Sequence, residues 1–200
     1  MARPNRLDVR SHARPRFASI DHRPGGGARS SASATVGPQA WEARMGRYRI
    51  DNMKDFIGKE IHLSPWLTVT QEMVTGFATA TLDPDWMHVD VPRSRRESPF
   101  GETIVQGFLM QSLIIHFTHE GHAEPEDIAY GLNYGMDRVR FLLPVKTGSR
   151  LRDRIVLTGF DERATGRYLQ RTTHTIEVEG ETKPAVVADW LVLWFKTLQS

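Results

Sequence analysis

The most continuous apolar stretch of the chain covers residues 104–117. Its apolar side chains fall on nearly every side of an ideal helix, and such a helix is normally buried. A second helix is predicted over residues 72–81, where Thr70 is a suitable start and the apolar positions share one side. The pattern therefore indicates one central buried helix, preceded by a shorter amphipathic helix.

Strand-like runs fill much of the remaining chain. Residues 57–63 are predicted as a short edge segment. Four longer runs follow the central helix, at residues 133–142, 150–160, 168–179 and 185–195. Residues 162–166 and 179–181 have the composition of hairpin turns, so the last three strands should form an antiparallel meander. The pattern alone predicts an α+β fold, in which an antiparallel sheet is wrapped around the long central helix.

The short helix should stop before Asp83, because Pro84 disfavours the helical region for the residue in front of it. His88 follows at a spacing that does not fit one helical face. We therefore predict a loop in which His88 folds back toward the Asp83 carboxylate. An Asp and a His placed together can orient a water molecule, with one group taking a proton while the other donates one. In the alternative interpretation, Asp83 caps the loop and His88 only hydrogen-bonds to it.

The residues from Asp83 to the central helix also form a recognisable motif. The string LDPDWMHVD, the Phe-Gly turn and the Gly that opens the apolar helix place Asp83, Met87, His88, Asp90, Phe100, Gly101 and Gly107 in order. This order resembles that of the MaoC-like dehydratases, the (R)-specific enoyl-CoA hydratases of the hotdog fold. The WMHVD string, NYGMDRVRFLLPVKTGSRLR and KPAVVADWLVLWF are most similar to the nodulation protein N-like branch.

The resemblance implies a site and a reaction. Asp83 and His88 would share the proton transfers, and the backbone N–H of Gly107 would polarise a thioester carbonyl. Substrate-binding positions would be Asp85, Trp86, Gln106 and Asn133. The substrate would be an acyl-CoA thioester, hydrated as a trans-2-enoyl-CoA to the (3R)-3-hydroxyacyl-CoA or dehydrated in reverse. No organic cofactor or metal is implied, and hotdog relatives pair their sheets, which predicts a homodimer.

Four residues depart from the wider family pattern. Asp85 stands in place of Asn, Trp86 in place of Pro and Gln106 in place of His, while Pro84 is unusual beside the acid. These departures bear on how a substrate fits more than on the class of reaction. Two alternatives stay open at this point, a hotdog acyl-CoA thioesterase and a non-catalytic acyl-CoA-binding protein on the same fold.

The role implied for Gly107 depends on where the central helix begins. Thr103 and Gln106 have the spacing of a capping box, which would make Thr103 the N-cap and would bury the Gly107 N–H inside the helix. A helix that begins nearer Gln106 would leave this N–H unpaired. The sequence permits both starts.

Charge divides the chain into two parts. Residues 1–49 carry a net charge of +7 and residues 50–200 a net charge of −5, which gives +2 for the whole. The first part is rich in Arg, Pro, Gly, Ser and Ala, so we predict a disordered tail before a MaoC-like domain at residues 50–200. A transit peptide and a nucleic-acid-binding arm are both disfavoured. The preferred interpretation is a translated upstream region, with the functional chain starting near Met45 or Met53.

Cysteine is absent and no apolar run has the length of a membrane span. The expectation is a soluble, cytoplasmic protein that binds neither nucleic acid nor membrane. His116, His119 and His122 superficially resemble metal ligands but lack the context of a zinc motif. His174 is predicted to be a satisfied polar group on a strand. The arginines at 93, 95 and 96 form either a solvated charge run or a contact with coenzyme A phosphates, and the charge run is the preferred interpretation.

Overall fold

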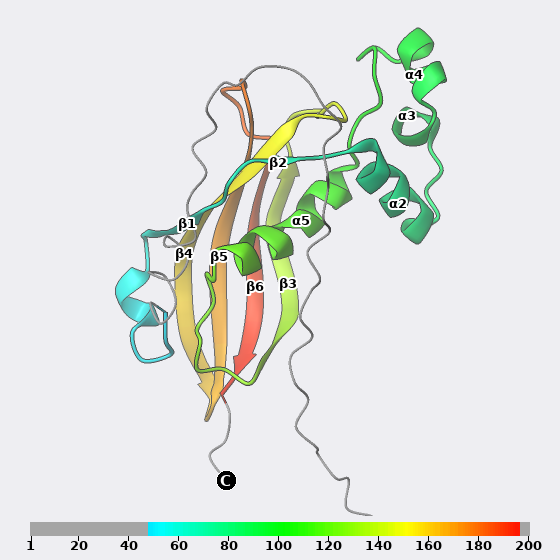
Figure 1. Ribbon diagram of the computed structural model, residues 1–200. Coiled ribbons are helices and arrows are strands. Elements are labelled where there is room, and N and C mark those ends of the chain that lie inside the picture. Colours follow the sequence, from blue (N-terminus) through cyan, green and yellow to red (C-terminus); the bar gives the residue numbers. More distant parts are fainter. Residues whose placement is uncertain (1–47, 197–200) are drawn as a thin grey trace, which may run out of the picture. The chain divides into compact units, whose positions relative to one another are not determined.

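The computed structural model describes residues 48–196, which lie within one compact unit. The strands are β1 (Glu60–Leu63), β2 (Leu67–Thr68), β3 (Tyr130–Phe141), β4 (Arg150–Ala164), β5 (Arg167–Val178) and β6 (Val186–Phe195). They form one antiparallel sheet in the order β1-β4-β5-β6-β3, with β2 also paired to β4 (Figure 1). All but the last two residues of the predicted tail lie outside the described residues.

The predicted meander is confirmed, because β4, β5 and β6 are consecutive neighbours in the sheet. Gly166 and Gly180 both have positive φ angles, of 71° and 85°, in the turns that join these strands. Glycine adopts this backbone conformation without the steric cost that a side chain brings. The turn residues therefore set the register that places the apolar positions of each strand on one face.

Helix α5 (Gly107–Glu120) lies across one face of the sheet (Figure 1). It buries Leu109, Met110, Ile114 and Phe117. These residues belong to the same hydrophobic cluster as inward-facing residues of the sheet, which include Leu151, Ile155, Ile176, Ala188 and Trp190. A sheet packed around one long helix is the hotdog arrangement that the resemblance implied, and the predicted fold class is confirmed.

The central helix begins three residues later than its apolar pattern predicted. Ile104 and Val105 are extended instead, because Val105 donates its N–H to the Val145 carbonyl and Ile104 forms a bridge with Lys146. These bonds pair backbone groups of Ile104 and Val105 without a helix. Gln106 becomes the N-cap, so the capping box at Thr103 is not formed.

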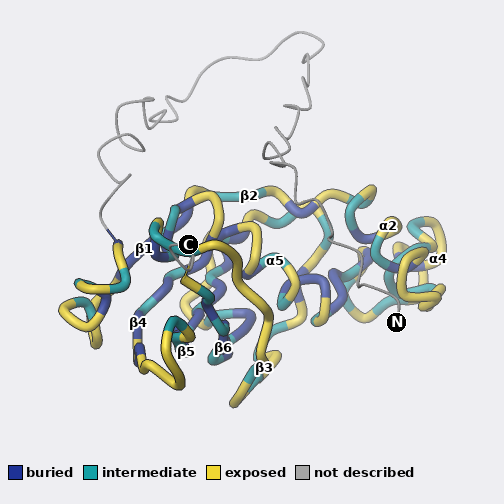
Figure 2. Tube along the Cα trace, turned by 90° about the horizontal axis from the view of Figure 1, so that it is seen from below, coloured by how far each residue is buried: buried dark blue, intermediate teal, exposed yellow. Residues whose placement is uncertain are grey.

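Besides the 3-10 helix near its N-terminus, the described region has three α-helices before α5, and they gather near the N-terminal end of α5, away from β1 (Figures 1 and 2). They are α2 (Gln71–Thr81), α3 (Trp86–Val89) and α4 (Val91–Glu97). The hydroxyl of Thr70 accepts the N–H of Met73 and begins α2 as predicted, and Leu82 ends it in the left-handed conformation with φ 57°. The predicted loop after α2 contains the single helical turn of α3, which carries His88.

Tyr48, the first residue that the structure describes, belongs to the hydrophobic core. Its ring is only 2% exposed, and its hydroxyl donates to the Ile61 carbonyl at 2.7 Å. The short 3-10 helix η1 (Met53–Phe56) follows, and the Phe56 ring packs edge-on against Tyr48. None of the helices within residues 48–196 has both the length and the hydropathy needed to cross a bilayer.

Strand β3 begins at Tyr130, three residues before the run predicted at residues 133–142, and it forms an edge of the sheet. Its side chains are largely exposed along the strand (Figure 2). Eight large hydrophobic side chains in the described region are exposed, and six of them lie on β3 and α5. These six, which we name the β3/α5 apolar face, are Phe108, Ile115, Tyr130, Leu132, Tyr134 and Phe141.

Candidate functional site

His88 and Gly107 line one cavity of about 330 Å³ at the start of α5. The other lining residues are mainly apolar: Ile104, Val105, Met110, Phe141, Leu142, Leu143 and Pro144. The predicted motif therefore brings a titratable side chain and a helix N-terminus together in a largely apolar environment. Such an environment strengthens hydrogen bonds to a charge that develops within it.

The imidazole of His88 has a defined orientation. Its Nδ1 lies 2.7 Å from the Ile104 carbonyl oxygen. Because a carbonyl can only accept, Nδ1 carries the proton, and Nε2 of the neutral ring is left as a hydrogen-bond acceptor. The Ile104 N–H in turn donates to the Met87 carbonyl at 3.0 Å, which fixes α3 against the segment that leads into α5.

Gly107 is the first residue of α5, and within residues 48–196 its N–H has no hydrogen-bond partner. The first N–H groups of a helix lack intrahelical partners and favour negative charge. A Cβ at this position would lie 3.0 Å from the Phe141 ring. Glycine therefore lets this ring approach the helix start while the N–H stays unpaired.

Asp83 is placed differently from the prediction. Its carboxylate is exposed and makes no hydrogen bond or ion pair with any described residue, His88 included. The flanking residues Leu82 and Pro84, together with Val89, line a larger apolar cavity of about 560 Å³. The sequence neighbours of Asp83 thus line one cavity, while His88 lines the other.

The four predicted substrate-binding residues do not converge on one point. Asp85 caps α3 by accepting the Met87 N–H at 2.8 Å, and the Trp86 ring lies under the Arg93 guanidinium at 4.3 Å. Gln106 is buried and donates to the Val74 carbonyl of α2 at 3.0 Å. Asn133 lies on β3 and lines a separate cavity of about 410 Å³ with Gln111, Met136 and Trp190.

The arginines of α4 mostly pair within their own helix. Arg93 bonds to Glu97 at 2.7 Å, and Arg96 lies 3.5 Å from the same carboxylate. The hydrogen bond from Arg93 is the main reason that the pKa of Glu97 lies below its usual value. These pairs are exposed, as the charge-run interpretation expects.

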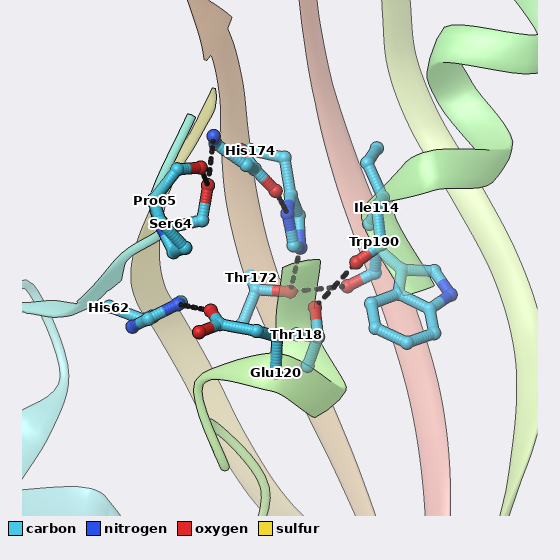
Figure 3. Close-up of polar contacts among 10 residues, drawn as sticks. His62, Ser64, Pro65, Ile114, Thr118, Glu120, Thr172, His174 and Trp190 are labelled. Carbon is cyan, nitrogen blue, oxygen red and sulfur yellow. Dashed lines mark hydrogen bonds and ion pairs between the residues drawn. The ribbon is translucent and has the colours of Figure 1, made fainter. Parts of the chain in front are cut away.

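A buried His and carboxylate pair lies inside the fold. This pairing was not predicted from the sequence. His174 Nδ1 bonds to Asp153 Oδ2 at 2.6 Å, and both side chains are fully buried. Figure 3 shows His174 next to Thr172, with the separate His62–Glu120 pair nearby. The prediction that His174 is a satisfied polar group is confirmed. Asp153 could have been identified as its partner from the alternation of inward-facing positions along the neighbouring strands β4 and β5.

The remaining histidines of residues 48–196 are not grouped as metal ligands. The hydrogen bond that the imidazole donates to Glu124 is the largest cause that raises the pKa of His119, whose side chain is 58% exposed. No group of three or more potential metal-ligating side chains occurs in the described part of the chain.

Comparisons with known proteins identify the family of this chain. The model of the MaoC like domain matches residues 52–179. Nodulation protein N of Rhizobium leguminosarum bv. viciae is 43% identical over 137 residues, which cover 68% of this chain and 85% of that protein. The 3-hydroxyacyl-thioester dehydratase Z of Mycobacterium tuberculosis is 39% identical over 135 residues, which cover 68% and 88%.

Among solved structures, the (R)-hydratase of A. caviae involved in PHA biosynthesis superposes with a TM-score of 0.56 at 20% identity. That superposition covers 68% of this chain and 94% of the other, and it supports the fold alone. The family model spans more than half of the chain, and the two sequence relatives share well over 30% identity along two thirds of it. This chain therefore belongs to the family of MaoC-like dehydratases, with the nodulation protein N proteins among its homologues.

Proposed function

We propose that this protein is a hydro-lyase that adds water to a trans-2-enoyl thioester to form the (3R)-3-hydroxyacyl thioester, or removes it in reverse. The observation that carries the proposal is the shared cavity of His88 and Gly107. One of these residues presents a basic nitrogen and the other an unpaired N–H at a helix start. Support for the reaction class comes from the dehydratase family and from the activity in the name of the mycobacterial relative.

In the proposed mechanism the thioester carbonyl binds at the N-terminus of α5. The Gly107 N–H donates to the carbonyl oxygen and stabilises the enolate charge that forms as water attacks the β-carbon. His88 Nε2 accepts a proton from the attacking water. The oxygen of that water becomes the hydroxyl group, and the α-carbon receives a proton. The net change is addition of one water molecule across the carbon–carbon double bond.

Asp83 is the proposed second member of the catalytic unit. It lies in the connection between α2 and α3, and the single turn of α3 follows with His88 on it. Its exposed carboxylate is free to orient the water or to exchange a proton with the substrate. The family motif supports a shared role for Asp83 and His88.

We further propose a homodimer, formed across the β3/α5 apolar face. Among residues 48–196, β3 is an edge strand that pairs only with β6, and an open apolar edge is a template for pairing with another strand. Six exposed large hydrophobic residues in one region indicate a contact surface rather than scattered exposure. The self-complementary partner is a second copy of this chain. That copy would also cover the cavity that contains Asn133.

The proposal is tested with crotonyl-CoA and the purified full chain. Loss of the enoyl absorbance, with 3-hydroxybutyryl-CoA of R configuration as the product, is the expected result. Release of free coenzyme A thiol without hydration would assign thioester hydrolysis instead. A chain that neither hydrates nor hydrolyses enoyl thioesters of short, medium and long acyl length would refute the enzyme assignment.

A non-catalytic acyl-thioester-binding protein is the second candidate function. The observation that favours it is the absence of a hydrogen bond between Asp83 and His88 in the described structure. Calorimetric titration with a saturated acyl-CoA separates the two candidates when combined with the turnover assay. Binding without turnover of any enoyl thioester would support the binding function.

A further inference from the structure

Gln71 connects three segments that meet at the candidate site. It is the first residue of α2 and is partly buried. Its Nε2 donates to the His88 carbonyl oxygen at 2.8 Å, and its Oε1 accepts the Thr103 hydroxyl at 2.6 Å. One amide side chain thus joins α2 to the turn that carries His88 and to the segment that leads into α5.

We infer that Gln71 is a positioning residue, which holds His88 at a fixed place relative to the N-terminus of α5. The expected effect on turnover rests on the proposed function, whereas the expected effect on the position of His88 does not. Gln71 lies outside the motif that carries the family resemblance, and the turn that carries His88 is only four residues long. A single turn has little intrinsic stability, so its placement depends on bonds from outside.

The bonds around Thr103 show how the Gln71 amide can hold His88 in place. Thr103 is 2% exposed, and its carbonyl accepts the Thr147 N–H at 2.9 Å, so the residue is anchored to the main body of the fold. The next residue, Ile104, holds His88 Nδ1. Gln71 therefore fixes the backbone of His88 to the same segment that fixes its ring. Loss of the amide would leave α3 held to this segment by the ring contact and by the bond from the Ile104 N–H to the Met87 carbonyl.

The amide chemistry is specific. Gln71 donates to a carbonyl and accepts from a hydroxyl at the same time, which a carboxylate or a thioether cannot do. Gln106 forms a parallel link, because its Nε2 donates to the Val74 carbonyl in the next part of α2. Both links run between α2 and the segment that starts α5. Two independent amides thus tie α2 to the segment that starts α5.

The test uses two variants that remove these bonds with little change of volume. Gln71→Met keeps the length of the side chain but loses these two bonds and an exposed bond to the Thr75 hydroxyl. Thr103→Val removes only the hydroxyl. Glu72→Gln is the matched control, because Glu72 is exposed on the same turn of α2. In crotonyl-CoA assays we expect kcat to fall at least about tenfold for Gln71→Met, because small misplacement of a catalytic group is costly. KM should change less than about twofold, and the control should match the wild type.

A second measurement does not depend on turnover. In the wild type labelled with ¹⁵N-histidine, the His88 ring should show the Nδ1-protonated tautomer with a slowly exchanging proton. Gln71→Met and Thr103→Val should broaden or shift this signal and speed its exchange. A His88 spectrum and a kcat both unchanged in Gln71→Met would overturn the inference. Should Gln71→Met fail to fold, Thr103→Val decides by the same criteria.

The two measurements also separate this inference from the proposed function. A wild type without turnover would refute the hydratase proposal, and the histidine spectra would still show whether Gln71 positions His88. Turnover in the wild type with an undisturbed His88 in both variants would leave the hydratase proposal intact and refute the positioning role.

Discussion

The Nδ1 of His88 donates to the carbonyl oxygen of Ile104 at 2.7 Å, just ahead of the helix that Gly107 begins. This bond leaves the other ring nitrogen as the acceptor, and His88 is one of the residues that line the cavity. It also links the ring to the segment that sets the start of α5. The orientation of the candidate base and the position of the helix N-terminus are therefore determined by the same few residues.

Asp83→Asn and His88→Ala should each lower turnover at least about a hundredfold, the usual effect of removing a positioned acid or base. The double variant should be little worse than either single one, because groups that act as a unit are strongly non-additive. Steady-state kinetics with crotonyl-CoA provide the measurement. Glu102→Gln, which neutralises another exposed carboxylate nearby, is the control. Wild-type turnover in both single variants would remove the pair from the mechanism.

Gly107→Ala should lower turnover at least about tenfold, because its Cβ would lie 3.0 Å from the Phe141 ring and displace that ring within the cavity. Gly76→Ala is the matched control, since a Cβ there meets nothing within 4 Å. Gly76 lies inside α2, so the control should gain roughly 0.5–1 kcal/mol of stability. Kinetics and thermal melting of both variants provide the check. Equal activity in the two would show that the helix start needs no glycine.

Leu132→Glu and Tyr134→Glu should convert a dimer into a monomer, because each places a charge in the β3/α5 apolar face. Light scattering at micromolar concentration measures the mass. Ile57→Glu is the control, because Ile57 is 44% exposed but lies far along the chain from this face. A wild type that is monomeric under these conditions would contradict the proposed dimer.

A chain that starts at Met45 should melt and turn over like the full chain, since it retains Tyr48. A chain that starts at Met53 loses the buried Tyr48 ring and its bond to Ile61. Removal of a buried aromatic side chain costs about 3–5 kcal/mol. The melting temperature of the shorter chain should accordingly fall by roughly 6 °C or more. A large loss in the Met45 chain would show that residues 1–44 contribute to the folded protein.

His174→Ala should destabilise the fold by about 3–5 kcal/mol, because it leaves the fully buried Asp153 carboxylate without its partner. His119→Ala is the matched control. It removes an exposed His–Glu pair, and such pairs contribute at most about 1 kcal/mol. Denaturant unfolding measures both. Comparable losses of unfolding free energy in the two variants would show that the buried pair stabilises the fold no more than the exposed pair does.

Local signals in the sequence were sufficient for much of the fold. Thr70 starts α2 because its hydroxyl can accept an N–H three residues ahead, and Gly166 and Gly180 mark turns that need positive φ. The alternation of apolar residues identified β4, β5 and β6 to within a few residues. These features depend on neighbours close in sequence, so they can be derived without the tertiary structure.

The start of α5 and the contacts of the candidate site were decided only by the tertiary structure. Ile104 and Val105 fit a helix by their pattern, but bonds to residues 145 and 146 hold them extended. The link from Gln71 to Thr103 spans 32 positions, and the pair of Asp153 with His174 spans 21. The sequence by itself determined the motif, the fold class and the family likeness. Which side chains meet was decided by the sheet and by the helices that pack at its edge, because hydrogen bonds between distant segments leave no periodic pattern in the chain.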